Sequence, residues 1–400
     1  MDKHMLLTAA PILEESESTQ LQKNVEPMTN DGLGATDIGP RDLELDVQNP
    51  DLLTPPTTDH ANPIIPNLKW PFSLSPMRIS DGGWARETTI REFPVSTTMA
   101  GVDMRLKPGA IRELHWHKQG EWAYMINGRA RITCIDPEGR NFIDDVSEGD
   151  LWFFPGGYPH SIQALKEGCE FLLVFPDGSF SENSTFLLTD WLIHTPRSVI
   201  AKNFGISQAD LTSLPTHELY IFQDEVPGPL EKDMVSSPYG SVENPFDFRL
   251  LQQKPRKTSG GTVRVGDSTS FKVSTEISGG LVEIEPGGMR ELHWHPAIDE
   301  WQYYIDGRGR MTVFASGGAA RTFDYQAGDV GFVPRTMGHY IENTGDTQLR
   351  FLELFNSPLF LDVSLNQWLA LIPPELVRAH LRSNDRFMRA LRKEKWPVVK

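Results

Sequence analysis

Short apolar segments, separated by turns rich in glycine and proline, recur along the chain from Trp70 onwards. Five segments have the length and composition of β-strands: 102–106, 123–126, 130–134, 150–154 and 171–175. Asn127-Gly128 lies between two of them and predicts a tight hairpin turn. After a polar loop at 176–185 the pattern becomes helical over 186–193, and a second helix is expected between Pro196 and Gly205. This pattern is typical of an all-β domain followed by short helices.

The second half of the chain repeats the order of the first. A Val-Ser-Thr triplet at 95–97 recurs at 273–275, and the helical Trp191 and Pro196 have counterparts in Trp368 and Pro373. Spacing that is kept over so long a stretch indicates an internal duplication and therefore two domains. We expect the first domain at 66–235, with the loop at 176–185, and the second at 236–400. Residues 1–65 are polar and rich in proline, which predicts a partly disordered N-terminal arm.

Each half also contains the segment Arg-Glu-Leu-His-Trp-His, at 112–117 and at 290–295. On a strand, His-x-His places both imidazoles on one face and the tryptophan on the other. A glutamate follows beyond a tight turn, and a third histidine follows that glutamate by 39 residues in both halves. Three imidazoles and one carboxylate suit a divalent transition metal, so two metal sites are predicted. The proposed ligands are His115, His117, Glu121 and His160 in the first half, and His293, His295, Glu300 and His339 in the second.

Composition narrows the choice of partner. The chain has 38 Lys and Arg against 54 Asp and Glu, a net charge of −16, which argues against nucleic acid and anionic membranes. Cys134 and Cys169 match no metal or redox spacing, so two buried thiols are expected. No stretch has the length of a transmembrane helix, and the apolar run at 5–13 is a poor signal peptide. A cytoplasmic location is expected, with secretion as the alternative.

The two metal frames resemble the first cupin motif, and Gly149-x5-Pro155-x-Gly157-x2-His160 resembles the second. The second half departs from it at Thr336, where the family prefers glycine, and the first departs at Ala164, where asparagine is usual. Two cupin domains with complete ligand sets resemble the bicupin oxalate decarboxylases. This resemblance implies two β-barrel (double-stranded β-helix) domains with short appended helices, two Mn²⁺ ions per chain, and dioxygen as a co-factor. It also implies conversion of oxalate to formate and carbon dioxide by a homo-oligomer, either a trimer or a hexamer.

Four further residues are candidates for catalysis. Arg112 and Arg290 precede the first histidine of each set and would grip a substrate carboxylate; the alternative is a surface salt bridge. Glu182, in Ser181-Glu182-Asn183-Ser184-Thr185, resembles the proton-carrying lid of the family, although Ser184 or Thr185 could also cap the following helix. Glu353 interrupts an apolar strand where the first half has Leu173, as either a satisfied buried acid or a proton donor.

We therefore expect the first domain to be the main catalytic site, with Glu182 as proton shuttle. An oxalate oxidase that produces peroxide, and a non-catalytic storage-type bicupin, remain open as alternatives. The ligand spacing does not distinguish manganese from iron.

Overall fold

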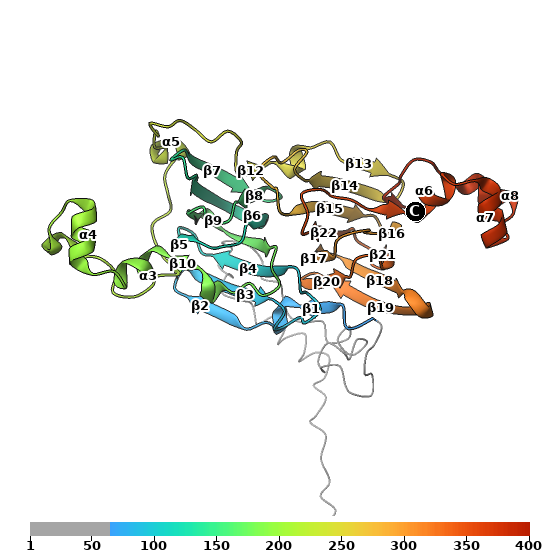
Figure 1. Ribbon diagram of the computed structural model, residues 1–400, viewed down its shortest axis with the longest axis horizontal. Coiled ribbons are helices and arrows are strands. Elements are labelled where there is room, and N and C mark those ends of the chain that lie inside the picture. The colour runs from blue at the N-terminus through green and yellow to red at the C-terminus, as the bar shows by residue number, and fades with distance from the viewer. Residues whose placement is uncertain (1–64) are drawn as a thin grey trace, which may run out of the picture.

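The computed structural model describes residues 65–400, which form two β-rich domains side by side (Figure 1). Except for Ile65, the predicted N-terminal arm lies outside the described residues. None of the helices in the described part of the chain is long and apolar enough to cross a membrane. The duplicated all-β architecture predicted from the sequence is confirmed.

The N-terminal domain is built around two long strands, β6 and β9, which contribute to both of its layers. One layer has the order β12-β8-β6-β9-β4-β3-β2, while β7 pairs with β6, and β5 pairs with β9, β10 and β11. The strands of this domain are β2 (Met77–Ser80), β3 (Gly83–Thr88), β4 (Ala100–Leu106), β5 (Ile111–Trp116), β6 (Glu121–Ile135), β7 (Asn141–Ser147), β8 (Leu151–Phe154), β9 (His160–Phe175), β10 (Phe186–Leu187), β11 (Ile221–Phe222) and β12 (Asp247–Phe248).

The C-terminal domain repeats this arrangement with two separate sheets. Their orders are β1-β20-β17-β22-β15-β14-β13 and β19-β18-β21-β16-β23, with β24 also paired to β16. Its strands are β1 (Lys69–Pro71), β13 (Arg256–Thr258), β14 (Gly261–Gly266), β15 (Ser278–Ile284), β16 (Met289–Trp294), β17 (Glu300–Asp306), β18 (Arg308–Ala315), β19 (Ala319–Gln326), β20 (Asp329–Val333), β21 (Gly338–Asn343), β22 (Leu349–Phe355), β23 (Val363–Ser364) and β24 (Val398–Val399).

The hairpin turn predicted at Asn127-Gly128 is wrong. Strand β6 runs unbroken from Glu121 to Ile135, and its register against β9 shifts on either side of Gly128. Gly128 has φ +78, and a Cβ there would lie 2.1 Å from the carbonyl oxygen of Gly168. The residue pair therefore bends one strand from the first layer into the second instead of reversing the chain.

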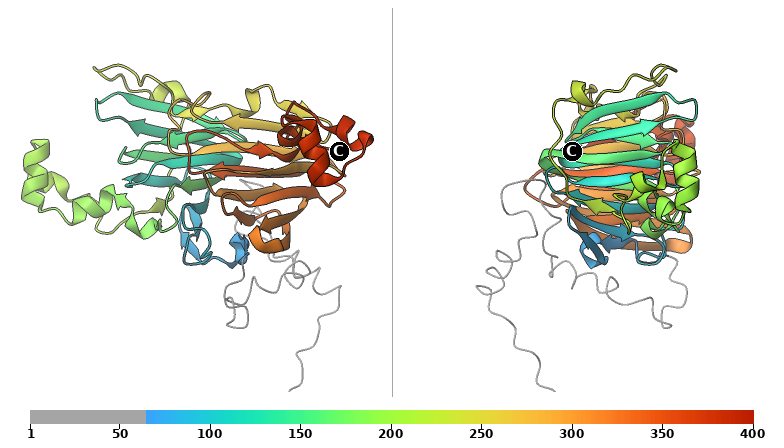
Figure 2. Two further views of the ribbon diagram at one scale, coloured as in Figure 1. Left: turned by 45° about the vertical axis from the view of Figure 1, so that its right-hand side comes forward. Right: turned by 90° about the vertical axis from the view of Figure 1, so that its left-hand side faces the viewer.

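Short helices extend from both ends of the molecule (Figures 1 and 2). In the N-terminal domain, α3 (Leu188–Ile193) and α4 (Arg197–Phe204) confirm the two predicted helices, and α4 ends at Gly205 with φ +68. Phe186 and Leu187, expected at the start of the first helix, instead form β10 and pair with β5. The remaining helices are α5 (Leu230–Asp233), α6 (Leu365–Ala370), α7 (Pro374–Leu381), α8 (Asp385–Ala390), and the 3₁₀ segments η3 (Phe72–Leu74), η4 (Glu182–Ser184), η5 (Gln208–Leu211), η6 (Leu250–Gln252) and η7 (Ser316–Gly318).

A shared hydrophobic core joins the two domains. Trp122 and Trp301, each next to a predicted metal-binding glutamate, are fully buried in it. A Cβ on Gly279 would lie 2.6 Å from the ring of Trp122, and a Cβ on Gly101 would lie 2.6 Å from the ring of Trp301. Each domain thus needs a glycine to accommodate the tryptophan of the other.

The domains also exchange strands. Strand β1 precedes the N-terminal domain in the chain but pairs with β20 of the C-terminal domain, and β12 precedes the C-terminal domain but pairs with β8 of the N-terminal domain. Lys69 of β1 forms a buried ion pair with Asp329 at 3.1 Å. Both cysteines are buried and free, as expected.

Candidate metal centres and lid

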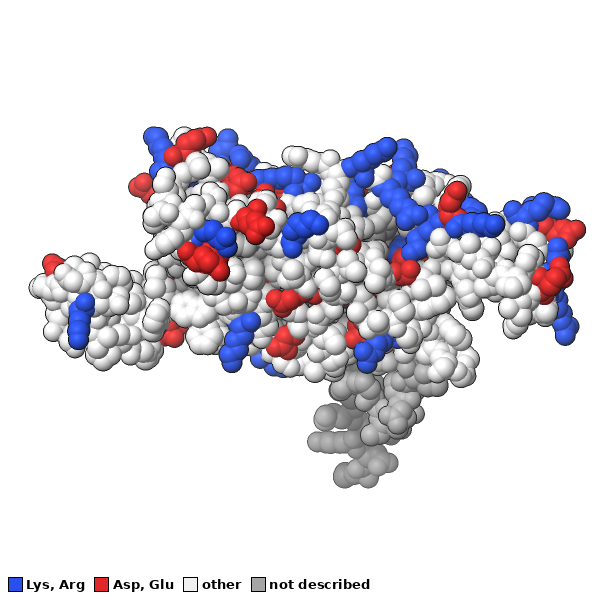
Figure 3. All heavy atoms as spheres, turned by 45° about the horizontal axis from the view of Figure 1, so that its top comes forward, with Lys and Arg blue, Asp and Glu red and all other residues white. Residues whose placement is uncertain are grey.

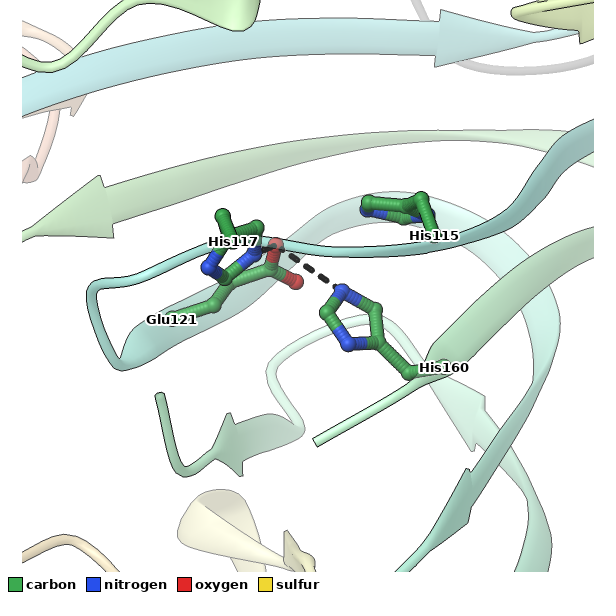
Figure 4. A group of neighbouring side chains, drawn as sticks. All are labelled: His115, His117, Glu121 and His160. Carbon is green, nitrogen blue, oxygen red and sulfur yellow. Dashed lines mark hydrogen bonds and ion pairs between the residues drawn. The ribbon is translucent and has the colours of Figure 1, made fainter. Parts of the chain in front are cut away.

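The structure brings the four proposed ligands of the first half together. His115 lies on β5, His117 follows the end of that strand, Glu121 begins β6 and His160 begins β9 (Figure 4). All four are buried, and their ligand atoms lie within 4.8 Å of one another. The indole of Trp116 is stacked on Phe186 with a centroid distance of 5.5 Å, in agreement with the expected alternation of faces.

Backbone carbonyl groups orient the three imidazoles. The Nδ1 atom of His115 lies 2.6 Å from the carbonyl oxygen of Glu113, and that of His117 lies 2.6 Å from the carbonyl oxygen of Gln119. The Nδ1 atom of His160 lies 2.8 Å from the carbonyl oxygen of Tyr158. A carbonyl oxygen only accepts, so each Nδ1 carries the proton and each Nε2 keeps its lone pair. This is the tautomer in which the three rings can bind a metal through Nε2.

The second half builds the same centre from β16, β17 and β21. His293, His295, Glu300 and His339 are buried, with ligand atoms within 4.8 Å of one another. The Nδ1 atom of His293 lies 2.7 Å from the carbonyl oxygen of Glu291, and that of His295 lies 2.8 Å from the carbonyl oxygen of Leu361. The Nδ1 atom of His339 lies 3.1 Å from the carbonyl oxygen of Met337. Both predicted ligand sets are therefore assembled, and in both a backbone carbonyl oxygen faces each Nδ1 atom.

Burial sets the charge state of these groups. Desolvation, together with the nearby Arg112 guanidinium, holds the pKa of His115 well below its usual value, and burial with Arg290 does the same for the pKa of His293. For Glu121 and Glu300, burial favours the neutral acid, but the adjacent histidines outweigh burial and lower the pKa of both carboxyls. Neutral imidazoles and an ionised carboxylate are the forms that bind a metal cation.

Several buried polar atoms of the two ligand sets have no hydrogen-bond partner, which is what a metal site requires. Among residues 65–400, the Nε2 atoms of His160, His293, His295 and His339 and the Oε2 atom of Glu300 make no hydrogen bond. Glu300 Oε2 nevertheless lies 2.9 Å from His295 Nε2 and 2.8 Å from His339 Nε2. Unpaired lone pairs directed at one point in a dry interior are costly unless a cation satisfies them. The nitrogen and oxygen donor set fits a manganese or ferrous ion.

The two centres differ in what holds the glutamate. Trp152 Nε1 donates to Glu121 Oε1 at 3.1 Å in the first centre. In the second, Gln302 donates to Glu300 Oε1 at 2.8 Å, and Tyr304 donates in turn to Gln302 at 2.9 Å. The indole and amide leave one carboxylate oxygen free for the metal. These supporting residues were not predicted from the sequence, because they belong to no motif of their own.

Arg112 and Glu182 meet beside the first centre. Arg112 Nη2 donates to Glu182 Oε2 at 2.9 Å, and the Tyr220 hydroxyl donates to the same oxygen at 3.0 Å. Glu182 is only 6% exposed although it lies in the polar loop. Burial and the Glu182 charge raise the pKa of Tyr220, so its hydroxyl keeps the proton that it donates. Arg112 is itself only 1% exposed, so the alternative of a surface salt bridge is wrong for this residue.

The loop does not cap the helix that follows it. Helix α3 begins at Leu188, and its N-cap residue Leu187 makes no side-chain capping bond. Ser181 caps the short segment η4 instead, accepting a hydrogen bond from Asn183 N. The expectation that Ser184 or Thr185 caps the helix is therefore wrong, because two residues of β10 intervene.

In the second centre, Arg290 has different hydrogen-bond partners from those of Arg112. Arg290 Nε donates to Glu353 Oε1 at 2.8 Å, and its Nη2 donates to Glu353 Oε2 at 3.2 Å and to Asp362 Oδ2 at 2.5 Å. Lys395 also contacts Asp362, and burial together with Arg290 lowers the pKa of Lys395 to about 8. Glu353 is a satisfied buried acid in this structure. Asp362 and Lys395 were not predicted from the sequence because they lie far from the histidine motif in the chain.

Comparison with known proteins gives the family. The cupin family model matches residues 72–211 and 248–387. The chain is 61% identical to oxalate decarboxylase OxdC of Bacillus subtilis over 92% of this chain and 95% of that protein, and 39% identical to a probable oxalate decarboxylase of Arthroderma benhamiae over 94% and 93%. A solved structure from a study of the Mn(II) centres of the Bacillus subtilis enzyme is 60% identical, with a TM-score of 0.85, covering 94% of this chain and 99% of that one. The chain therefore belongs to the cupin family and, within it, to the two-domain oxalate decarboxylases.

Proposed function

We propose that this protein is a manganese-dependent oxalate decarboxylase, which converts oxalate to formate and carbon dioxide at its N-terminal metal centre. The observation that carries the proposal is the Glu182 carboxylate, which a polar loop places on Arg112 beside the first ligand set. Similarity to oxalate decarboxylases over almost the whole chain supports the substrate. The corresponding loop of the second half supplies Asp362 instead, already paired with Arg290 and Lys395.

Each ligand set would hold one manganese ion. Direct cleavage of the C–C bond of oxalate would leave a poor carbanion, so an electron must be removed first. Manganese together with dioxygen would supply this one-electron oxidation. Imidazole and carboxylate ligands disfavour the soft metals and allow both manganese and ferrous iron. The Mn(II) centres of the Bacillus subtilis relative favour manganese here.

Arg112 would bind and polarise the substrate. Its Nε is buried and has no hydrogen-bond partner among residues 65–400. A guanidinium with a free donor suits a planar carboxylate, which can accept two parallel hydrogen bonds. Arg112 would thus hold the oxalate carboxylate that does not leave as carbon dioxide.

Glu182 would move the proton. Its carboxylate accepts the proton of hydrogen oxalate and returns it to carbon after carbon dioxide has left, so that HC₂O₄⁻ gives CO₂ and HCO₂⁻ with atoms and charge balanced. Tyr220 and Arg112 hold this carboxylate in place, and the buried position of Glu182 excludes water. General acid–base groups of this kind contribute about 10²- to 10⁴-fold to rates.

We also propose that the chain assembles into a trimer or hexamer through its helical ends. Exposed Trp191 (61%) lies on α3 and Phe204 (62%) on α4, and exposed Leu371 (61%) directly follows α6. Segment 188–211, with α3 and α4, has two Asp and Glu against two Lys and Arg, whereas segment 374–395 has three against seven. Figure 3 shows Lys and Arg side chains gathered over the C-terminal end. Exposed apolar side chains at both ends favour contacts between copies of the chain, and sedimentation analysis would measure the assembly. The cytoplasmic location expected from the sequence stays a prediction, to be checked by cell fractionation.

The decisive experiment measures formate and peroxide from oxalate in acid with the manganese-loaded protein. A decarboxylase produces about one formate per oxalate and little peroxide. Stoichiometric peroxide would identify an oxalate oxidase, and absence of turnover with full manganese would identify a metal-binding bicupin without this activity.

A further inference from the structure

Few hydrogen bonds join residues 181–185, the part of the loop that forms the lid, to the rest of the described chain. Besides the two bonds to the Glu182 carboxylate, the backbone N–H of Glu182 donates to Glu87 Oε2 at 3.1 Å. Asn183, at the tip, is exposed but accepts a hydrogen bond from Arg78 Nη1 at 3.4 Å. Arg78 lies on the edge strand β2, which the metal motif does not include.

Arg78 makes a second, closer contact with the wall of the site. Its Cζ lies 3.5 Å from the centroid of the Tyr220 ring, and Arg112 Cζ lies 4.3 Å from the same centroid. Two guanidinium groups at these distances would overlap if they shared one face, so the ring lies between them. Arg78 Nη2 also pairs with Glu218 at 2.7 Å, but these side chains are 35% and 48% exposed, so this ion pair contributes little. The stack on the buried Tyr220 is the stronger attachment.

Tyr220 gives the stack a direct connection to the acid. Its backbone has φ +56, an unusual conformation for an aromatic residue, and its amide donates to Glu113 Oε2 at 2.6 Å. The backbone is thus fixed, while the ring depends on its neighbours for its angle. A ring clamped between Arg78 and Arg112 presents its hydroxyl to Glu182 in one orientation.

The duplicated half provides a comparison. The strand registers place Arg256 at the position of Arg78 and Pro397 at the position of Tyr220. Arg256 donates to the Lys395 carbonyl oxygen, and it has no aromatic ring to stack on at that position. The edge-strand arginine is therefore present in both halves, but only Arg78 contacts a lid and the tyrosine beneath it.

We propose that Arg78 is the latch of the lid: it clamps Tyr220 and the loop tip, and so positions Glu182 for proton return. This inference rests on the proposed function, because it assumes that Glu182 carries the proton. Arg78 would act on Glu182 through its contacts with Tyr220 and Asn183.

The latch would control which product forms. With the lid closed, Glu182 protonates carbon and HC₂O₄⁻ gives CO₂ and HCO₂⁻. With the lid open, the protonation fails and dioxygen takes both electrons, so that HC₂O₄⁻ + O₂ + H⁺ gives 2 CO₂ + H₂O₂. A loosened latch should therefore raise peroxide per oxalate consumed and leave manganese binding unchanged.

The test compares Arg78→Ala with the matched variant Arg256→Ala in the fully manganese-loaded protein. Hydrogen exchange reports lid opening at Glu182, Ser184 and Thr185, whose amides are bonded in the closed loop. Loss of one cation–π contact should speed exchange there roughly five- to thirtyfold in Arg78→Ala. Peroxide per oxalate should rise in the same variant, whereas Arg256→Ala should leave both quantities unchanged.

Arg78→Lys keeps the charge but loses the planar stack, so its values should lie between Arg78→Ala and wild type.

Two results would overturn the latch. The first is that Arg78→Ala and Arg256→Ala show the same hydrogen-exchange rates in the lid and the same peroxide per oxalate. The second is that Arg78→Lys shows wild-type values of both quantities, which would mean that only the positive charge of Arg78 matters. If Arg78→Ala does not fold, wild-type lid exchange in both Arg78→Lys and Asn183→Ala overturns it instead. Glu182→Gln, assayed in parallel, separates the two proposals. If it loses formate production while Arg78→Ala behaves as wild type, only the latch fails; if it keeps normal formate production, the proposed function fails.

Discussion

The two halves of the molecule hold the same four metal ligands but close their centres differently. In the first half, Arg112 is paired with Glu182, which belongs to the short segment 181–185 that few hydrogen bonds hold in place. In the second half, Arg290 is paired with Glu353, which belongs to a central strand, and with Asp362, which Lys395 also contacts. A movable acid suits proton transfer, whereas a network of fixed charges suits a closed centre. The difference indicates that duplication kept the metal ligands and changed the partners of each guanidinium.

Removal of a metal ligand should break this comparison most severely. His115→Ala should lower manganese from about two to about one ion per chain and abolish most activity, because a three-ligand remnant binds weakly. His293→Ala should lose the same amount of metal but keep much more of the turnover. Elemental analysis and oxalate assays measure both quantities. Equal loss of activity in the two variants would contradict the assignment of catalysis to the first half.

The next largest effect is expected from the acids. Glu182→Gln keeps shape and removes the proton carrier, so formate production should fall about 10²- to 10⁴-fold. Glu353→Gln should cost much less activity. Both variants must be compared at equal manganese content, because either change could empty a site indirectly. An active Glu182→Gln beside a fully metallated but inactive Glu353→Gln would move the chemistry to the C-terminal domain.

Glu353→Gln should instead act on stability. It removes one partner of a buried ion pair, a change that typically costs about 3–5 kcal/mol, and Asp362 should keep the loss near the lower value. Thermal unfolding at matched manganese content measures the effect. A melting temperature equal to that of wild type would show that Asp362 alone satisfies Arg290.

The smallest expected effect concerns a turn present in both halves. Thr336 has φ +69 and Gly157 has φ +82, and the amide of each donates at 2.8 Å to the carbonyl oxygen of the second histidine of its set. A β-branched residue is strained in this conformation, so Thr336→Gly should stabilise the protein by about 0.5–1 kcal/mol after the entropy cost of glycine. Gly157→Thr should destabilise it by about 1–2 kcal/mol, although no atom lies within 4 Å of the new Cβ. Chemical denaturation of both variants tests the pair, and opposite signs are required.

The sequence predicted the ligand sets and the duplication because both depend on local spacing. His-x-His alternation and a glutamate beyond a turn need only strand geometry, and the structure has both. The Asn127-Gly128 turn failed because the same dipeptide serves a hairpin or a bend, and only the approach of Gly168 decides between them. Register between distant strands placed Tyr220, Asp362 and Lys395 at the two centres, and no local pattern reports such contacts. Alignment of the two halves gave one indication that the centres differ, because Glu353 occupies the position that Leu173 has in the first half.

The exchanged strands have a consequence for the order of events during synthesis. Lys69 pairs with Gly331, so β1 must wait for 262 further residues before its partner exists. At elongation rates of about 5–20 residues per second, this delay is on the order of tens of seconds. The first domain also lacks β12 until Asp247 and Phe248 have emerged. The nascent first half therefore leaves the ribosome without one of its edge strands and with its own leading strand unpaired. Folding of this chain is completed only when the second half is nearly finished, which makes late translation the step most exposed to misassembly.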